Sequence, residues 1–342
     1  MRARATLGTG LLVLLLAFSA FGALGQAPEV DVTLSFDNLE PLATDHYEGW
    51  LIVGGSPVST GKFVVANGGD LEDLQGNPVS TFRVGNVDLD QTTTFVLTIE
   101  PEGDSDAIPA AVKPLAGDLN AAKTSATLTP NLGVSLAGIG GQYILATPSN
   151  GASTNENSGV WFLDRSGASP VAGLTLPDLS GTDWEYEGWA VIGGVPVTTG
   201  KFDMPDGADG SAPYSGTQAT PPFPGEDFLV NAPSGLTFPT DLAGQTIVIS
   251  IEPRGAADTD PGPFQFKPLA AGVPAGAVDH LEYDLTDQSD TLASGVATLA
   301  SVPAAAPFDM VLVGVIIAVV VAVIVIVVVV LIRRQSGGEG PE

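Results

Sequence analysis

Apolar and polar residues alternate along the middle of the chain, between two long apolar runs near its ends. Residues 30–36 place an apolar side chain at every second position, which is typical of a half-buried β-strand. Other short segments rich in β-branched and aromatic residues lie between turn-forming residues, and we expect strands at 47–53, 57–65, 95–99, 142–146, 160–163 and 247–251. Between the two runs, the sequence shows no helical periodicity of useful length. The pattern predicts the all-β fold class, with short strands packed as β-sandwiches.

The first apolar run predicts an export signal. Arg2 and Arg4 precede an apolar stretch at 11–18, and small residues follow at 20–25. A basic start, a short apolar core and a small-residue cleavage site are typical of a secretory signal peptide. We expect residues 1–25 to be removed by cleavage after Gly25, with Ala23 at the −3 position. The alternative is a retained N-terminal anchor, for which the apolar stretch is short.

The second run predicts a transmembrane helix. Residues 311–332 contain neither a charged residue nor a proline, and a helix of 22 residues reaches about 33 Å, enough to cross the hydrocarbon core. Arg333 and Arg334 follow directly, so the positive-inside rule places the tail 333–342 in the cytoplasm. We expect a single-pass type I protein of the cell membrane, with a stalk at 301–310. The alternative, a buried core helix, fits poorly because the run is apolar on all sides.

Small residues recur every four positions within this run, at Gly314, Ala318 and Ala322. Such a stripe lets two helices approach closely in a bilayer. We therefore consider these three residues candidates for pairing two copies of the chain into a homodimer.

The region between the runs contains an internal repeat. Segment 47–63 returns at 186–202 with 12 of 17 positions identical. The shared motif comprises Tyr47, Glu48, Trp50, Gly54, Gly55 and Lys62 in the first copy and Tyr186, Glu187, Trp189, Gly193, Gly194 and Lys201 in the second. Further matching blocks follow in the same order, at 99–101 and 113–116 and again at 251–253 and 267–270. We expect tandem domains at 26–125 and 126–300, the second with a Pro/Gly-rich insertion at 203–239.

The repeated segment suggests specific roles for its residues. The Gly-Gly pair between two apolar stretches predicts a tight β-hairpin in each copy. We expect Trp50 and Trp189 to anchor the two cores rather than to form exposed platforms for carbohydrate. Glu48 and Lys62 lie on facing arms of the hairpin, like their counterparts in the second copy, and we expect cross-strand ion pairs rather than catalytic couples.

Composition excludes several function classes. The chain has 39 acidic and 12 basic residues, a formal charge of −27, whereas a nucleic-acid binder needs a basic footprint. The absence of cysteine excludes disulfides, iron–sulfur clusters and thiol nucleophiles. The two histidines, His46 and His280, lie in no recognisable nucleophile context, and no Gly-rich phosphate loop is present. We therefore expect no enzymatic activity and no organic cofactor.

Calcium is the one metal that the acidic residues suggest. Asp104 and Asp106 in the first copy, and Asp258 and Asp260 in the second, occupy the same loop of the repeat. Carboxylates on a turn suit Ca²⁺, although neither loop has EF-hand spacing. Solvated acidic loops are the plainer interpretation.

The motifs resemble a known family. The order Tyr-Glu-x-Trp, Gly-Gly-x-Pro-Val and Ile-Glu-Pro-x-Gly is similar to the extracytoplasmic C-terminal domain of anti-sigma-K factor (RskA) proteins, over about 30–115 and 174–269. The resemblance implies a β-sandwich outside the cytoplasm. Members of that family hold a sigma factor with a cytoplasmic domain on the N-terminal side of their membrane span. This chain departs from that plan, because its N-terminus resembles an export signal and its expected cytoplasmic tail has ten residues.

The sequence therefore predicts a non-enzymatic cell-surface protein used for binding, adhesion or envelope structure, with an unknown surface protein or polysaccharide as partner. The absence of Asn-x-Ser/Thr sites favours a prokaryotic envelope. Edge strands and the insertion at 203–239 are the expected contact surfaces. The alternative is an envelope-sensing regulator that acts through a partner or by proteolytic shedding at the stalk.

Overall fold

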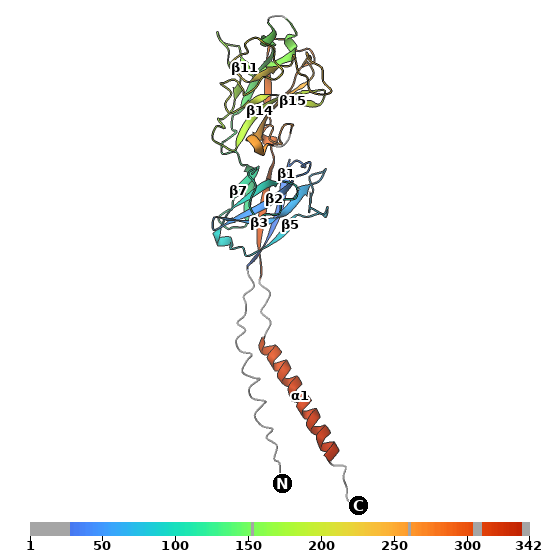
Figure 1. Cartoon of the computed structure of the whole chain (residues 1–342). Helices are drawn as coiled ribbons and strands as arrows, with labels where there is room; N and C mark the ends of the chain where they lie inside the picture. The colour runs from blue at the N-terminus through green and yellow to red at the C-terminus, as the bar shows by residue number, and fades with distance from the viewer. Residues whose placement is uncertain (1–27, 152–153, 259–260, 304–309, 337–342) are drawn as a thin grey trace, which may run out of the picture. The chain divides into compact units, whose positions relative to one another are not determined.

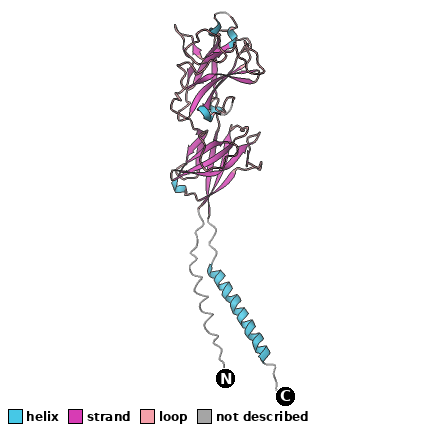
Figure 2. Ribbon diagram, in the orientation of Figure 1, coloured by secondary structure: helices cyan, strands magenta, loops and turns pink. Residues whose placement is uncertain are grey.

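A computed structural model describes residues 28–151, 154–258, 261–303 and 310–336 (Figure 1). The expected signal peptide, residues 304–309 of the stalk and residues 337–342 of the tail lie outside the described residues. Residues Val30–Ala300 form one compact unit, and the two ends of the chain form a second unit. Figure 2 shows that the compact unit is built from strands joined by loops, as the all-β prediction requires.

The compact unit contains two large antiparallel sheets. The first sheet has the order β4-β3-β2-β6-β7-β8-β20-β1-β5. Its strands are β1 (Glu29–Asp37), β2 (His46–Val53), β3 (Ser56–Val65), β4 (Leu71–Glu72), β5 (Thr81–Gly85), β6 (Thr92–Glu100), β7 (Leu115–Asp118), β8 (Ser125–Pro130) and β20 (Ser294–Val302). We call residues 29–130 together with 294–302 the first lobe.

The second sheet has the order β15-β14-β17-β18-β19-β9-β10-β16, and β13 also pairs with β9. Its strands are β9 (Gly140–Leu145), β10 (Gly159–Trp161), β13 (Leu174–Thr175), β14 (Trp184–Ile192), β15 (Val195–Phe202), β16 (Gly225–Asp227), β17 (Thr246–Pro253), β18 (Leu269–Gly272) and β19 (Glu282–Asp287). A small third sheet pairs β11 (Leu163–Asp164) with β12 (Val171–Ala172). We call residues 140–287 the second lobe.

Within the compact unit, the described helical segments are 3₁₀ turns of three residues each. They lie at Leu89–Gln91, Pro148–Asn150, Glu156–Ser158, Gly255–Ala257 and Ser289–Thr291. All seven strands expected from the sequence are confirmed, although segment 160–163 is divided between β10 and β11.

The repeated hairpins have the same geometry in both lobes. Gly54 and Gly55 both have positive φ, at 57° and 83°, and Gly193 and Gly194 follow them at 58° and 86°. Positive φ at both central residues matches the right-handed twist of the flanking strands and favours glycine. In the first lobe the sheet also folds over itself, because Phe36 of β1 stacks on Phe63 of β3 with ring centroids 5.7 Å apart. These contacts build a buried apolar core that extends through both sheets.

The last strand of the compact unit differs from the expected domain organisation. β20 lies between β8 and β1 in the first sheet, opposite β8 with Ala297 facing Ala126. The sequence assigned 126–300 to the second domain, and this range contains β8 except Ser125 and β20 except its last two residues. The division between the sheets therefore does not follow the expected boundary: the second lobe is inserted between two strands of the first. Alternate residues of β20 are buried, so the strand closes a gap in the first core.

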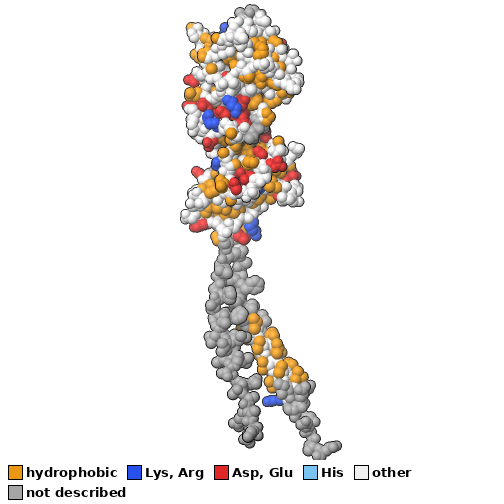
Figure 3. Space-filling model, viewed as in Figure 1, with side chains coloured by type: hydrophobic (Ala, Val, Ile, Leu, Met, Phe, Trp, Pro, Cys, Tyr) orange, Lys and Arg blue, Asp and Glu red, His pale blue; other side chains and the backbone are white. Residues whose placement is uncertain are grey.

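The other unit contains α1, which extends from Met310 to Ser336. Its described apolar side chains, from Val315 to Leu331, are exposed (Figure 3). The side chains at 310–314, 316, 332 and 334–336 lie outside the description. Within the described part of the chain, no helix has both the length and the hydropathy needed to cross a membrane. Ala318 and Ala322 of the expected pairing stripe are exposed on α1, and Gly314 belongs to the same helix.

The return of β20 can be tested by placing a charge in it. Ala297 is fully buried, so Ala297→Asp should lower the free energy of unfolding of the first lobe by about 3 kcal/mol or more, because the carboxylate has no partner there. Hydrogen exchange on the full chain should show faster exchange in β1 and β8. Val296→Asp is the control, since Val296 is 42% exposed on the other face of the strand. Unchanged exchange in β1 after Ala297→Asp would contradict the topology.

Candidate functional site

The two repeated tryptophans are buried. Trp50 is 1% exposed and Trp189 is 4% exposed, which confirms their role in the interior and excludes an exposed carbohydrate platform. The indole N–H of Trp50 donates to Thr98 Oγ1 at 2.9 Å, and that of Trp189 donates to Ser250 Oγ at 2.7 Å. Buried indole N–H groups require such partners, and both copies supply a hydroxyl from the strand next to the hairpin.

The repeated glutamate and lysine face each other across the hairpin, as expected. Glu48 of β2 lies opposite Lys62 of β3, and its Oε2 is 3.5 Å from Lys62 Nζ. Glu48 is 2% exposed, and its Oε1 accepts a hydrogen bond from the Ser59 hydroxyl. Lys62 also donates to the Asp104 carboxylate at 2.9 Å and to the Asp104 carbonyl at 2.7 Å. The cross-strand ion pair is confirmed, and the lysine has a further partner that the pattern did not predict.

The second copy repeats this arrangement with more acid. Lys201 Nζ lies 3.7 Å from Glu187, 3.2 Å from Glu185 and 2.7 Å from Asp258. Burial opposes the charge of Lys201, but its hydrogen bond and charge interaction with Asp258, together with the two glutamates, raise its pKa. Burial raises the pKa of Glu187. We call Glu48, Lys62 and Asp104, and likewise Glu187, Lys201 and Asp258, the two lysine centres.

Each lysine centre holds a loop against the hairpin. Asp104 lies in loop 101–114, which follows β6, and Asp258 lies in loop 254–268, which follows β17. A buried glutamate at the end of each strand binds the same loop further along: Glu100 accepts the backbone N–H of Ala110 at 2.9 Å, and Glu252 accepts that of Phe264 at 2.9 Å. Sequence reasoning missed these roles, although the repeated Ile-Glu-Pro block carried the signal.

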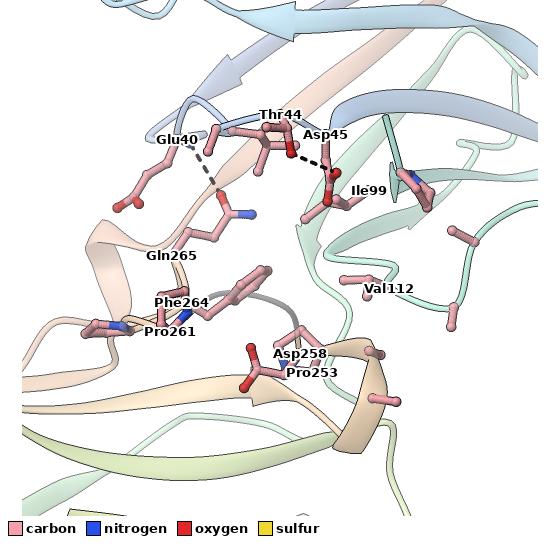
Figure 4. A pocket seen from close by; sticks show the side chains of 18 of the residues that line it. Glu40, Thr44, Asp45, Ile99, Val112, Pro253, Asp258, Pro261, Phe264 and Gln265 are labelled. Carbon is pink, nitrogen blue, oxygen red and sulfur yellow. Dashed lines mark hydrogen bonds between the residues drawn. The ribbon is translucent and has the colours of Figure 1, made fainter. Parts of the chain in front are cut away.

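The two loops meet in a cleft within the compact unit. Its volume is about 420 Å³, within the range of small-molecule and peptide sites. Figure 4 shows Phe264 and Asp258 of loop 254–268 across from Ile99 and Val112. The remaining lining residues are Glu40, Pro41, Leu42, Ala43, Thr44, Asp45, Pro101, Ala110, Ala111, Pro253, Ala256, Ala257, Pro261, Pro263 and Gln265.

Contacts between the lobes form one end of this cleft. The backbone N–H of Glu40 donates to Gln265 Oε1 at 3.3 Å (Figure 4), and the Glu40 carboxylate pairs with Lys267 at 2.9 Å. The lining is apolar and rich in proline, and its acidic groups are largely engaged with cations or N–H groups. The cleft can therefore receive an apolar or extended segment, and it offers no assembled nucleophile and base among the described residues.

The calcium candidates have other partners. Asp104 and Asp258 bind lysine ammonium groups, and Asp106 accepts the backbone N–H of Ile108 at 2.7 Å. Asp260 lies outside the described residues. Within the described ranges, no group of three or more His, Asp or Glu side chains could hold a metal ion.

The two histidines belong to different lobes. His46 begins β2 beside Glu100 and is 4% exposed, and burial, followed by the charge of Lys62, lowers its pKa. His280 lies in the turn before β19, with Nδ1 3.2 Å from Asp279 and Nε2 3.8 Å from Glu156. Neither geometry places a hydroxyl nucleophile against the imidazole.

Buried carboxyl groups also fix the insertion at 203–239. Asp227 of β16 is fully buried and accepts the indole N–H of Trp161 at 2.7 Å and the backbone N–H of Ser149 at 2.8 Å. Its neighbour Glu226 is also fully buried and accepts the Ser215 hydroxyl. Asp209 accepts the backbone N–H of Gly225 at 2.9 Å. The expected contact surface is therefore anchored by three acids that the sequence did not single out.

Burial raises the pKa of these acids. The pKa of Glu226 and that of Glu252 rise to about 7, and that of Asp209 rises to about 6, because burial disfavours the charged form. In each case hydrogen bonds from neighbouring groups oppose part of the effect. The second lobe therefore contains carboxyl groups that ionise near neutral pH.

Comparisons with known proteins found no matching family model, no matching curated protein and no matching solved structure.

Removing the lysine of one centre tests its structural role. Lys62→Met leaves the buried Glu48 without its cation and should lower the free energy of unfolding by about 1–3 kcal/mol in urea titrations. Lys113→Met removes the same charge from a lysine that donates a 3.4 Å hydrogen bond to the Ala111 carbonyl, and it should have a small effect. Equal effects of the two variants would contradict a specific role for Lys62.

The raised pKa values predict pH-dependent stability. Glu226 and Glu252 bind a proton more tightly when folded than when unfolded, so their contribution is fully present below about pH 4.5. It is lost as pH rises to about 7, at a cost on the order of 1–3 kcal/mol per group. Thermal unfolding should show the second lobe melting at higher temperature at pH 5 than at pH 8.

Amide variants separate this effect from general charge repulsion. Glu252→Gln should raise the melting temperature at pH 8 and change it little at pH 5, because the amide resembles the protonated acid. Glu102→Gln removes one exposed carboxylate and is the matched control. A melting temperature that stays constant or rises between pH 5 and pH 8 would contradict the prediction.

Proposed function

We propose that the chain is a type I membrane-anchored cell-surface protein that displays two RskA-like β-sandwich domains for binding, adhesion or envelope structure. In this proposal residues 1–25 are the export signal, α1 crosses the membrane over 311–332, and both lobes are extracytoplasmic. Its partner is a surface protein or polysaccharide, and it has no enzymatic activity.

One observation carries the binding role. In both lobes the charged side chains that could perform chemistry are used to hold a loop: Lys62 binds Asp104, and Lys201 binds Asp258. These held loops, 101–114 and 254–268, wall the cleft of about 420 Å³. Loops fixed on a rigid sheet are the usual carriers of recognition, so the arrangement favours contact with a partner over catalysis.

The anchor is supported by the sequence of α1. Residues 311–332 lack charged residues and proline, and Arg333 and Arg334 follow them. The helix extends without interruption through this run, and the finding that no helix could cross a membrane covers only the described residues, which leave out the side chains at 310–314, 316 and 332. The acidic surface suits an exported protein as well, because a net charge far from zero keeps a domain soluble and repels anionic membranes.

The second candidate function is envelope sensing, and the RskA-like motifs favour it. Here the lobes would respond to the envelope and act through a partner or by shedding at 301–310. This alternative shares the membrane topology of the first proposal, and it differs in requiring regulated release of the lobes.

Protease treatment of intact cells tests the topology. In cells that express the full chain, added protease should digest the Trp50 and Trp189 hairpins, while an antibody to residues 333–342 should still detect the membrane-bound fragment. Protection of both hairpins would contradict export. Release of an intact fragment on envelope stress, without added protease, would instead support the regulatory candidate.

A pair of substitutions tests the anchor separately. Val320→Arg with Ile324→Arg places two charges at the centre of the proposed span and should release the protein from the membrane fraction, since each charge costs about 2.5–3.5 kcal/mol there. Val320→Ala with Ile324→Ala is the matched control and should stay in the membrane. Retention of the arginine variant would contradict a transmembrane anchor.

A further inference from the structure

A second hollow lies in the second lobe, away from loops 101–114 and 254–268. Its volume is about 420 Å³. Its floor is formed by Ile144 of β9, Trp161 of β10 and Leu163 of β11, which belong to an apolar cluster separate from the main core. Phe223 packs against this cluster. Pro222 and Arg165 belong to the wall of the hollow. We call this hollow the Trp161 groove.

The groove has the features of a preformed apolar site. Trp161 is 2% exposed, and its indole N–H is held by the buried Asp227, so the ring is fixed in place. Proline in the wall restricts the backbone, and rigid walls reduce the entropy lost when a ligand binds. Three large apolar side chains that lie within two residues of lining residues in the sequence are well exposed: Val171 at 54%, Val278 at 55% and Leu281 at 54%.

The groove also contains a guanidinium without a carboxylate. Arg83 pairs with Asp31, and Arg254 pairs with Asp203. Arg165 donates from Nη1 to the carbonyl of His280 at 3.4 Å, and within the described residues no carboxylate lies at ion-pair distance from its guanidinium. In a chain with a net charge of −27, acids are abundant, so an arginine without one beside an apolar hollow is available for an external anion.

Neighbouring acids limit which anion can bind. Glu282 accepts the backbone N–H of Arg165, and Asp164 and Asp279 lie close to the groove in sequence. These carboxylates would repel an extended polyanion, whereas a compact ligand with one negative charge can place it on the guanidinium alone. Arg binds a carboxylate through two parallel N–H groups, which gives direction as well as affinity.

We propose that the Trp161 groove binds an amphipathic carboxylic acid, with an aromatic or branched apolar body against Phe223 and Pro222 and its carboxylate on Arg165. This inference deepens the proposed binding function by assigning a ligand class to one surface. It does not depend on the membrane topology, so failure of either proposal is recognised separately.

The test uses 3-phenylpropionate as the probe and 3-phenylpropionamide as its neutral counterpart, with the full chain in mild detergent, which requires no insertion into a bilayer. Equilibrium dialysis should show the acid binding at least tenfold more tightly than the amide. Arg165→Gln should weaken binding of the acid at least tenfold and leave the amide unchanged, and Arg165→Lys should weaken the acid about two- to fivefold because a point charge replaces the planar fork.

Two further variants complete the test. Arg83→Gln removes the same charge from the first lobe and should leave binding of the acid unchanged. Phe223→Ala should weaken the acid and the amide alike, because it removes part of the apolar contact. The proposal is overturned if the acid does not bind, if the acid and amide bind equally, or if Arg165→Gln binds the acid as well as the original chain.

Discussion

The need to give every buried charge a partner shapes both lobes. Glu48 and Glu187 are buried on the first strand of their hairpins, β2 and β14. Each therefore needs a cation, and the facing strand of the hairpin supplies a lysine. That lysine has donors left over, which bind an aspartate from the loop that follows the next strand. One buried carboxylate thereby fixes the position of three strands and a loop. In each centre the lysine is the shared partner, because its loss would leave both the glutamate and the aspartate without that cation.

The second lobe has extended this use of buried acid. Its insertion at 203–239 is secured by Asp209, Glu226 and Asp227. A glycine that the repeat places at the same position of both hairpins, Gly61 and Gly200, leaves room for a different side chain in each lobe. Gly61 leaves room for Phe82 in the first lobe, whereas Gly200 leaves room for the Asp209 carboxylate, whose Cγ would lie 2.5 Å from an added Cβ. Several of these acids have no lysine partner and are held by hydroxyl and N–H groups, so burial raises their pKa. As pH approaches 7, the second lobe therefore takes up negative charge at buried carboxyl groups.

Local pattern predicted the strands and the repeated hairpins, because alternation with period two and a Gly-Gly turn are written within a few residues. It also predicted the burial of both tryptophans and the facing of Glu48 and Lys62. The return of β20 left no comparable mark: its inward side chains are Gly, Ala and Leu, and its partner Ala126 lies about 170 residues earlier. The Trp161 groove was equally hidden, since its floor, its arginine and Phe223 come from separate segments that only the folded sheet brings together.

The insertion of the second lobe between β8 and β20 also determines how a load would travel. A pull applied to the second lobe passes from β19 through residues 288–293 into one end of β20, and leaves the other end at Val302 toward α1. The strand carries that load along its own covalent backbone. The ladders from β20 to β8 and β1 therefore need not bear it, and the other strands of the first lobe stay outside the load path. If α1 is the anchor and the second lobe binds the partner, as proposed above, this connectivity lets a single strand act as the tether, while its buried side chains stay packed in the first core.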